Sequence, residues 1–168
     1  DYTIGVAVFN ESDSGVDSYL GVDSFKITGG VVNNAPSTAS ISRRINEDTT
    51  YTFSASDFSF SDPDSGDSLK SVLITSAPSS GQLLYNGSTF SIGSNGYSIL
   101  KADLGKLSFA PAANANGDAY TSFQFKVVDQ SDAASSAASV SFDVTPINDA
   151  PSTASISRRI NEDTTYTF

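Results

Sequence analysis

The sequence predicts an all-β protein, an antiparallel β-sandwich, and three of its features carry that prediction. Sixteen of the nineteen acidic residues are Asp, which favours turns, and only three are Glu, which favours helices. Short runs alternate between apolar and polar residues with a period of two, which indicates strands buried on one face. Turn-forming residues separate these runs about every 8–12 positions, a spacing typical of a sandwich.

Seven to nine short strands follow in order from this alternation, and nine candidate ranges are used to count strand directions. Their expected ranges are 38–45, 50–55, 70–75, 82–86, 89–92, 97–100, 106–109, 121–128 and 139–145. The residues expected to share the core-facing sides are Val72, Ile74, Leu107, Phe109, Phe123, Phe125, Val127, Val140, Phe142 and Val144. The one helical indication is a single turn near Lys101–Leu104. Two Asn-Gly pairs, Asn86-Gly87 and Asn95-Gly96, tolerate positive φ and predict tight type I′ hairpin turns.

An internal repeat organises the chain. Residues 35–53 and 150–168 are the same nineteen letters at an offset of 115 positions, which indicates tandem duplication. We therefore expect residues 35–149 to be one complete repeat and residues 150–168 to be the first strands of the next. Residues 1–34 are interpreted as the C-terminal strands of a preceding repeat, the alternative being an unrelated preceding domain.

Charge and composition exclude several function classes. A net charge of −10 argues against nucleic acid and against an anionic membrane surface as partners. The absence of His and Cys removes disulfides, thiolate metal sites and His-dependent catalytic triads. No apolar stretch approaches the length of a membrane span, so we expect no membrane insertion. Paired carboxylates can hydrolyse glycosides, but only in a cleft that holds the substrate. A small Ser-rich sandwich offers little concave surface, so we expect that this protein is not an enzyme.

Counting strand directions assigns the carboxylates to the two ends of the sandwich. The upstream end should hold Asp57, Asp62, Asp64, Asp67, Asp129 and Asp132, beside the entering linker residues Asn33 and Asn34. The downstream end should hold Glu47, Asp48 and Asp118, beside the exit residues Asn148 and Asp149. Carboxylates held this close repel one another unless a cation enters, and Ca²⁺ prefers such oxygen ligands. The alternative for the loop at 62–67 is an ordinary Asp/Ser/Gly surface turn.

Several motifs together resemble the bacterial cadherin-like repeats. The motifs are Pro146-Ile-Asn-Asp-Ala-Pro151 at the repeat joint, Asn46-Glu47-Asp48-Thr49 and its copy at 161–164, the Asp62-x-Asp64 pair, residues 111–117 and Phe123-x-Phe-x-Val-x-Asp129. The match covers about residues 33–168. Two positions depart from the cadherin pattern: Pro146 replaces an acidic residue before the linker, and Asn34 stands where the second linker has Asp149.

The resemblance implies a cadherin/Ig-like Greek key and a role outside the cell. Such repeats are strung along giant secreted bacterial adhesins, often of the RTX type exported by type I secretion, which support adhesion to cells or in biofilms. In cadherins a linker Asn-Asp, a Glu at the end of the first strand and a downstream Asp-x-Asp bind interdomain Ca²⁺. The residues that this implies as Ca²⁺ ligands, together with those from strand direction, are Asn33, Asn34, Asp62, Asp64, Asp67, Asp129, Glu47, Asp118, Asn148 and Asp149.

Three functions are weighed for the domain. The first is an extracellular structural spacer, stiffened by Ca²⁺ at its joints with neighbouring repeats of the same chain. The second is a module that binds a polysaccharide (glycan) or a cell-surface receptor protein. The third is a self-assembling fibre subunit, in which half-repeats of different chains complete one another by strand complementation.

Arg43 and Arg44 are interpreted as a solvated strand face or as partners of nearby Asp residues.

Overall fold

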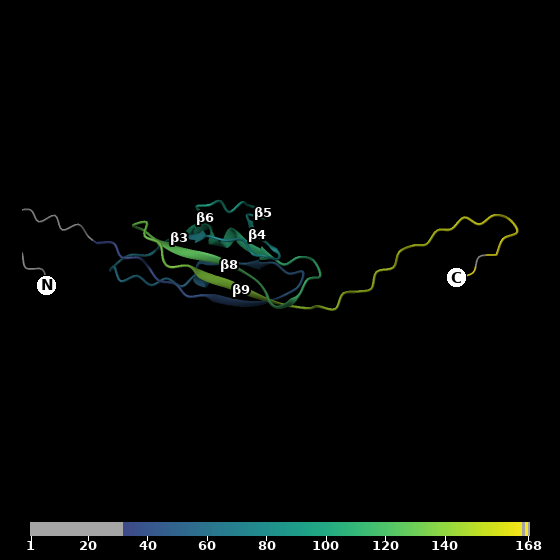
Figure 1. Ribbon diagram of the computed structural model, residues 1–168, viewed down its shortest axis with the longest axis horizontal. Coiled ribbons are helices and arrows are strands. Elements are labelled where there is room, and N and C mark those ends of the chain that lie inside the picture. The colour runs from purple at the N-terminus through teal and green to yellow at the C-terminus, as the bar shows by residue number, and fades with distance from the viewer. Residues whose placement is uncertain (1–31, 166, 168) are drawn as a thin grey trace, which may run out of the picture. The chain divides into compact units, whose positions relative to one another are not determined.

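The computed structural model describes residues 32–165 and 167, and within them the chain forms a β-sandwich (Figure 1). The strands are β1 (Ile41–Asn46), β2 (Tyr51–Thr52), β3 (Leu69–Ile74), β4 (Gln82–Tyr85), β5 (Ser88–Thr89), β6 (Tyr97–Leu100), β7 (Leu107–Ala110), β8 (Gly117–Asp129) and β9 (Ala138–Thr145). Two short 3-10 helices, η1 (Ala55–Asp57) and η2 (Lys101–Lys106), join them. The prediction of an all-β sandwich is confirmed.

The strands divide into a five-stranded and a four-stranded sheet. Their orders are β1-β9-β8-β3-β6 and β2-β7-β4-β5. All pairs between named strands are antiparallel except β1 with β9, which run parallel from Ile41 beside Val140 to Asn46 beside Thr145. The parallel pair agrees with the predicted strand directions, because both strands were expected to run toward the downstream end.

Aromatic side chains fill the space between the sheets. Phe53, Phe109, Phe123 and Phe142 are at most 1 % exposed, so each buries its whole ring. The rings of Phe109 and Phe142 stack with centroids 4.1 Å apart, and Phe53 meets Phe123 edge-on at 5.9 Å. All ten residues expected from the alternation to face the core are buried, whereas Leu73, on the opposite face of its strand, is half-buried.

The two Asn-Gly pairs form different turns. Asn86 and Gly87, both at positive φ, lie between the paired residues Tyr85 and Ser88, which confirms the predicted tight turn. The prediction for Asn95-Gly96 is wrong, since the bridge joins Gly93 to Gly96 around a Ser94-Asn95 turn. Gly96 follows the turn with φ 79°, and a Cβ there would lie 2.7 Å from the carbonyl oxygen of Ile74. Because the backbone at residue 96 lies so close to β3, a residue with a side chain does not fit at this position.

The segment boundaries differ from the expected ones where side chains compete for backbone groups. The first strand begins at Ile41 instead of residue 38, because the amide of Ala39 donates to the Ser59 hydroxyl and Ser37 pairs with Ser61. The second ends at Thr52, ahead of η1. The expected helical turn is η2. Among the described residues, no helix has the length and apolar character needed to cross a membrane.

The expectations for the two ends of the chain stay predictions. Residues 1–31, most of the expected preceding half-repeat, lie outside the described residues. In the described part of the C-terminal segment, residues 146–165 contain no strand and one turn at Glu162-Asp163.

Candidate metal centre

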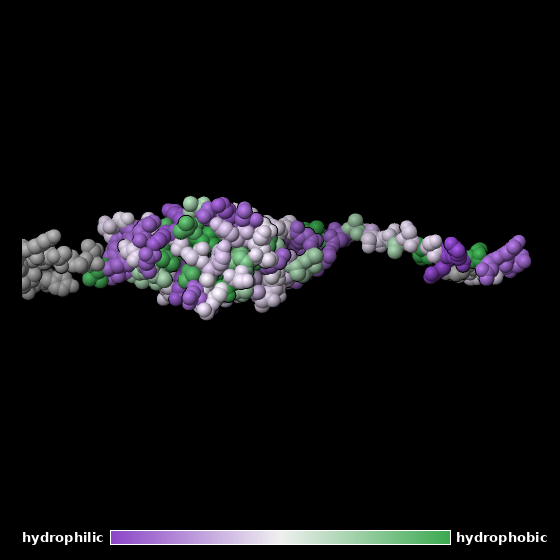
Figure 2. All heavy atoms as spheres, turned by 90° about the horizontal axis from the view of Figure 1, so that it is seen from above, coloured by the Kyte–Doolittle hydropathy of each residue, from purple (hydrophilic) through white to green (hydrophobic). Residues whose placement is uncertain are grey.

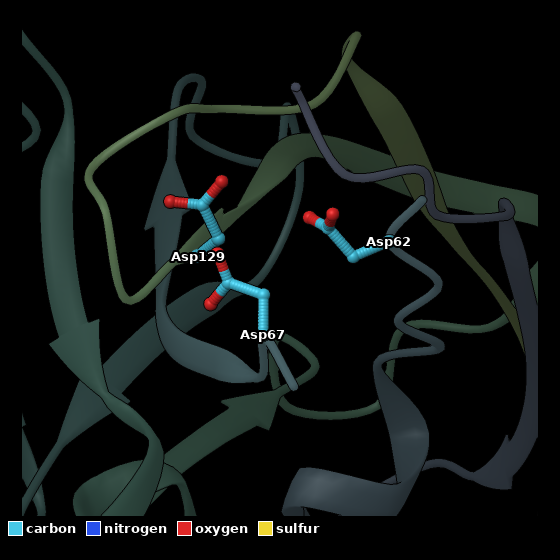
Figure 3. Close-up of side chains that lie close together, drawn as sticks. All are labelled: Asp62, Asp67 and Asp129. Carbon is cyan, nitrogen blue, oxygen red and sulfur yellow. The ribbon is translucent and has the colours of Figure 1, made fainter. Parts of the chain in front are cut away.

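Three carboxylates from two separate segments meet at one end of the sandwich (Figure 3). Asp62 and Asp67 lie in the loop between η1 and β3, and Asp129 is the last residue of β8. One oxygen of each lies within 4.8 Å of an oxygen of the other two. Within the described residues, this is the one group of three or more potential metal-ligating side chains.

The Asp62 carboxylate is held by its own loop and leaves one oxygen without a partner. Its Oδ1 accepts a hydrogen bond from the Asp64 amide at 2.7 Å, and the amide of Asp67 donates to the Asp64 carbonyl at 3.2 Å. Gly66 has φ 90°, which a residue with a side chain rarely adopts, so this glycine closes the turn. Asp62 Oδ2 is buried and accepts no hydrogen bond, a state that costs free energy unless something else binds it.

The other two carboxylates accept bonds from neutral donors. Asp129 is 0 % exposed; its Oδ1 accepts from the Ala133 amide at 2.8 Å and its Oδ2 from the Asn33 side-chain amide at 3.2 Å. Asp67 Oδ1 accepts from the amides of Ser68 and Gln130. In the part of the chain that the structure describes, no Lys or Arg forms an ion pair with any of the three carboxylates. Three carboxylates therefore share one space, and no side chain of residues 32–165 forms an ion pair with them.

The entering linker is tied to the same end. Asn34 donates from its backbone amide to Asp64 Oδ2 at 2.6 Å and from its side chain to Asp64 Oδ1 at 2.8 Å. Asn33 binds Asp129 as described above. The six upstream residues Asn33, Asn34, Asp62, Asp64, Asp67 and Asp129 thus lie together, with Asp64 turned toward the linker and the other three acids toward one another.

Two further acids expected at this end have other partners. Asp57 binds Arg43 Nη2 at 2.5 Å and the Tyr51 hydroxyl at 2.7 Å. Burial raises the pKa of Asp57, but the hydrogen bonds from Arg43, Tyr51 and Ser54 outweigh burial and lower it. Asp132 pairs with Lys70 at 2.5 Å. Cationic side chains on β1 and β3 therefore pair with Asp57 and Asp132, and neither acid belongs to the group of three carboxylates.

The downstream residues do not gather into a similar cluster. Glu47 is only 4 % exposed, and both its oxygens are occupied, by the Asn116 side chain at 3.0 Å and the Ile147 amide at 2.6 Å. These two bonds, the one from Asn116 first, lower the pKa of Glu47. Asp118 is 95 % exposed and lies 4.0 Å from Arg44. Glu47 therefore binds the backbone at Ile147, where the chain leaves the sandwich, and does not join Asp118 in a cluster.

The remaining downstream residues also have separate surroundings. Asp48 Oδ1 accepts from the Asn114 amide at 3.1 Å, and Asn148 donates to the carbonyl of Asp149 at 3.5 Å. Asn116 was not singled out as a functional residue, although it lies within the 111–117 motif. Asn116 and Glu47 are 69 residues apart in the sequence, so their contact is apparent only from the packing of the two loops.

The donor set of the cluster fits a hard cation. Asp62, Asp67 and Asp129 offer carboxylate oxygens, and a half-turn of the Asn33 amide would add a carbonyl oxygen. Oxygen-only ligation suits Ca²⁺, whereas Zn²⁺ sites are built largely from His and Cys. The unpartnered Asp62 Oδ2 is the atom that such an ion would satisfy.

Comparison with known proteins places this domain in a family. No curated protein matches the chain. The sequence profile described as bacterial Ig domain matches residues 33–143, a range that includes β1 to β8, most of β9, the linker asparagines and the three clustered acids. The observed sandwich and this match agree, and the chain belongs to the bacterial Ig domain family.

Proposed function

We propose that this domain is a spacer in an extracellular array of Ig-like repeats, and that Ca²⁺ bound at Asp62, Asp67 and Asp129 stiffens its upstream joint. The array would belong to a large secreted bacterial surface adhesin, of the kind that the cadherin-like motifs suggest, and would support adhesion to cells or in biofilms. Bacterial Ig-like sandwiches are typically structural modules without catalysis, which supports a spacer role.

One observation carries the Ca²⁺ part of the proposal: three carboxylates converge with no cationic partner among the described residues, and one buried oxygen has no hydrogen-bond partner there. At the 4.8 Å limit of their separation, each pair of charges repels by about 1 kcal/mol in water and by about 3.5 kcal/mol at an effective dielectric constant near 20. A divalent cation bound between the carboxylates adds attractions that outweigh these repulsions. The proposal therefore explains why the chain keeps three acids together there.

The link to the joint comes from Asn33 and Asn34. Both bind acids of the cluster loop or of β8, so an ion that orders those acids also orders the linker. Pro36 already restricts one backbone dihedral, which lowers the entropy cost of ordering. By the offset of 115, Asn148 and Asp149 correspond to Asn33 and Asn34. We therefore assign Asn148 and Asp149 to the joint with a following repeat, where they would meet that repeat's counterpart of the 62–67 loop.

Calorimetric titration of the 168-residue chain with Ca²⁺ tests binding. We expect one upstream site with a dissociation constant of roughly 10⁻⁴–10⁻³ M, as in other extracellular Ca²⁺ modules. Asp62→Asn should remove the heat of binding, whereas Asp103→Asn, which changes an equally charged residue paired with Lys106, should not. A wild-type chain that takes up no Ca²⁺ in this range would refute the metal assignment.

Small-angle scattering of a protein with two complete repeats tests the joint. Ca²⁺ should increase its maximum dimension, and Asp62→Ala with Asp64→Ala should abolish the increase while leaving the sandwich folded, because both side chains lie in a surface loop. If the double variant stiffens as the wild type does, the ligands lie elsewhere. If the wild type binds Ca²⁺ but never stiffens, the ion stabilises the domain without setting its orientation.

A further inference from the structure

A hollow opens at the end of the sandwich that also holds the three clustered acids. It is bounded by the start of η1, the start of β3, the junction of β6 with η2 and the residue that follows β8. Leu69 in its wall pairs with Asp129 of the cluster across the β3–β8 ladder. The hollow has a volume of about 650 Å³, within the range of about 300–1,000 Å³ that is typical of small-ligand sites.

The floor of the hollow is apolar and open to water. Leu69 and Leu100 line it together with two alanines. Leu69 is 5 % exposed, whereas Leu100 is 55 % exposed, because the alternation that turns Ile99 into the core turns Leu100 outward. Figure 2, seen from the side of β5 and β6, shows hydrophobic spheres between hydrophilic ones in the half of the sandwich nearer the entering linker. A ligand with an apolar face would cover Leu100.

Two lysines, Lys70 and Lys101, border this apolar floor. Lys101 is exposed and forms no ion pair with any acid that the structure describes, although the chain has a net charge of −10. Lys70 pairs with Asp132, whose side chain is 73 % exposed, and an ion pair this open to water is weak enough to be shared with a second anion. The hollow therefore offers two ammonium groups to a negatively charged ligand.

Gln130 adds neutral hydrogen-bonding groups at the rim. Its backbone amide donates to Asp67, and its side-chain amide donates to the Ser68 hydroxyl at 3.4 Å, which is longer than a usual N–H···O bond. Its side-chain carbonyl accepts no hydrogen bond within the part of the chain that the structure describes. The side chain can therefore both donate to and accept from the hydroxyl groups of a ligand.

A sugar ring that carries a carboxylate matches these three features at once. Such a ring has an apolar face of C–H groups, hydroxyls around its rim and one negative charge. An added peptide strand matches less well, because it would need the free edge of β6. The Gly93–Gly96 bridge and the contact of Phe90 with Tyr97, whose ring centroids are 4.3 Å apart, keep residues 90–96 beside the beginning of that edge.

We propose that the hollow binds a uronic acid residue of an acidic polysaccharide. Its carboxylate contacts Lys70 and Lys101, the apolar face of its ring covers Leu100, and its hydroxyls bind Gln130. The site needs no Ca²⁺ and goes beyond the spacer function, because it gives the array a ligand. One open site of this kind binds weakly, and repetition along an array raises the overall strength. The negative charge of the remaining surface repels anions, so binding should stay confined to the hollow.

Nuclear magnetic resonance of the isotopically labelled 168-residue chain tests the site. The probe is a trisaccharide of galacturonic acid, added in Ca²⁺-free buffer so that Ca²⁺ cannot bridge it to the acidic cluster, and a galactose trisaccharide of the same linkage is the neutral control. The acidic trisaccharide should bind several-fold more tightly than the neutral one and should shift the amide signals of Leu69, Lys70, Leu100, Lys101 and Gln130. No shift of these signals up to the solubility of the acidic trisaccharide would overturn the proposal.

Matched variants make the test specific. Lys101→Gln and Leu100→Ser, both at exposed positions, should each weaken binding of the acidic trisaccharide several-fold while the domain stays folded. Lys126→Gln removes an equal charge outside the lining and should leave binding unchanged. Equal losses in the two lysine variants would overturn the proposal, because overall charge and not the hollow would then attract the sugar. A glutamate pentapeptide that shifts the same signals at lower concentration than the trisaccharide would also overturn it, and would make an acidic peptide the ligand.

Discussion

Neutralising one carboxylate of the cluster should stabilise the metal-free domain, and most of this advantage over the wild type should disappear when Ca²⁺ is added. In Asp62→Asn, the amide keeps the oxygen that accepts from the Asp64 amide at 2.7 Å. Its NH₂ group replaces the unpartnered Oδ2 with a hydrogen-bond donor. The substitution removes two of the three pairwise repulsions and adds a hydrogen-bond donor where none existed.

The magnitude follows from the geometry. Each repulsion lies between about 1 and about 3.5 kcal/mol, and the half-buried positions of Asp62 and Asp67 place the net effect in the lower part of that range. We expect Asp62→Asn to stabilise the metal-free domain by about 1–2 kcal/mol, which raises Tm by roughly 4–8 °C for a domain of this size. Ca²⁺ at ten times the dissociation constant adds about 1.4 kcal/mol to the wild type, or roughly 6 °C. The variant should gain almost nothing.

Thermal unfolding followed by circular dichroism, in chelator and in 10 mM Ca²⁺ (about ten times the weaker expected dissociation constant), measures both effects. The matched control is Asp132→Asn, an acid that pairs with Lys70 instead of facing the cluster. It should lower Tm slightly in both solutions and keep the full Ca²⁺ response. An Asp62→Asn variant that melts below the wild type in chelator would show that the three carboxylates do not repel. A Ca²⁺ response equal to that of the wild type would show that the ion binds elsewhere.

Three further predictions concern the sandwich itself. Asp57→Ala leaves Arg43 and the Tyr51 hydroxyl without their partner and should cost about 1–3 kcal/mol in urea unfolding at pH 7. Because the pKa of Asp57 is lowered, its contribution is complete above its ordinary value near 3.8 and fades as the pH falls through the folded value, so the variant should show a flatter acid limb of stability against pH. Phe142→Ala empties the centre of the aromatic core and should cost about 3–5 kcal/mol, measured by the same unfolding; a loss below 1 kcal/mol would mean that the core repacks around the gap. Gly81→Ala brings a Cβ to 2.7 Å from the Ala110 carbonyl and should destabilise more than Gly87→Ala, where φ is similar but nothing lies within 4 Å; equal losses would mean that backbone strain alone decides.

The alternation of apolar and polar residues was enough to predict most of the strands, their buried faces and their directions. A period of two is a local property: Phe123, Phe125 and Val127 face one side whatever lies opposite them. Direction is a running count along the chain, so Asp62, Asp67 and Asp129 could be assigned to one end before any pairing was known. The repeat of residues 35–53 at 150–168 is likewise readable without a structure.

The contacts among residues at one end could not be predicted in the same way, because they depend on how distant segments pack. Lateral position depends on the order of strands in the sheets, which alternation does not encode: β1 pairs with β9, so Glu47 meets the Ile147 amide instead of forming a cluster with Asp118. Asp57 belongs to the same predicted end as Asp62, yet it turns to Arg43, because a charge–charge hydrogen bond at 2.5 Å outweighs a place among like charges. Local periodicity determines the face on which a side chain lies, and the packing of distant segments determines which residues it contacts.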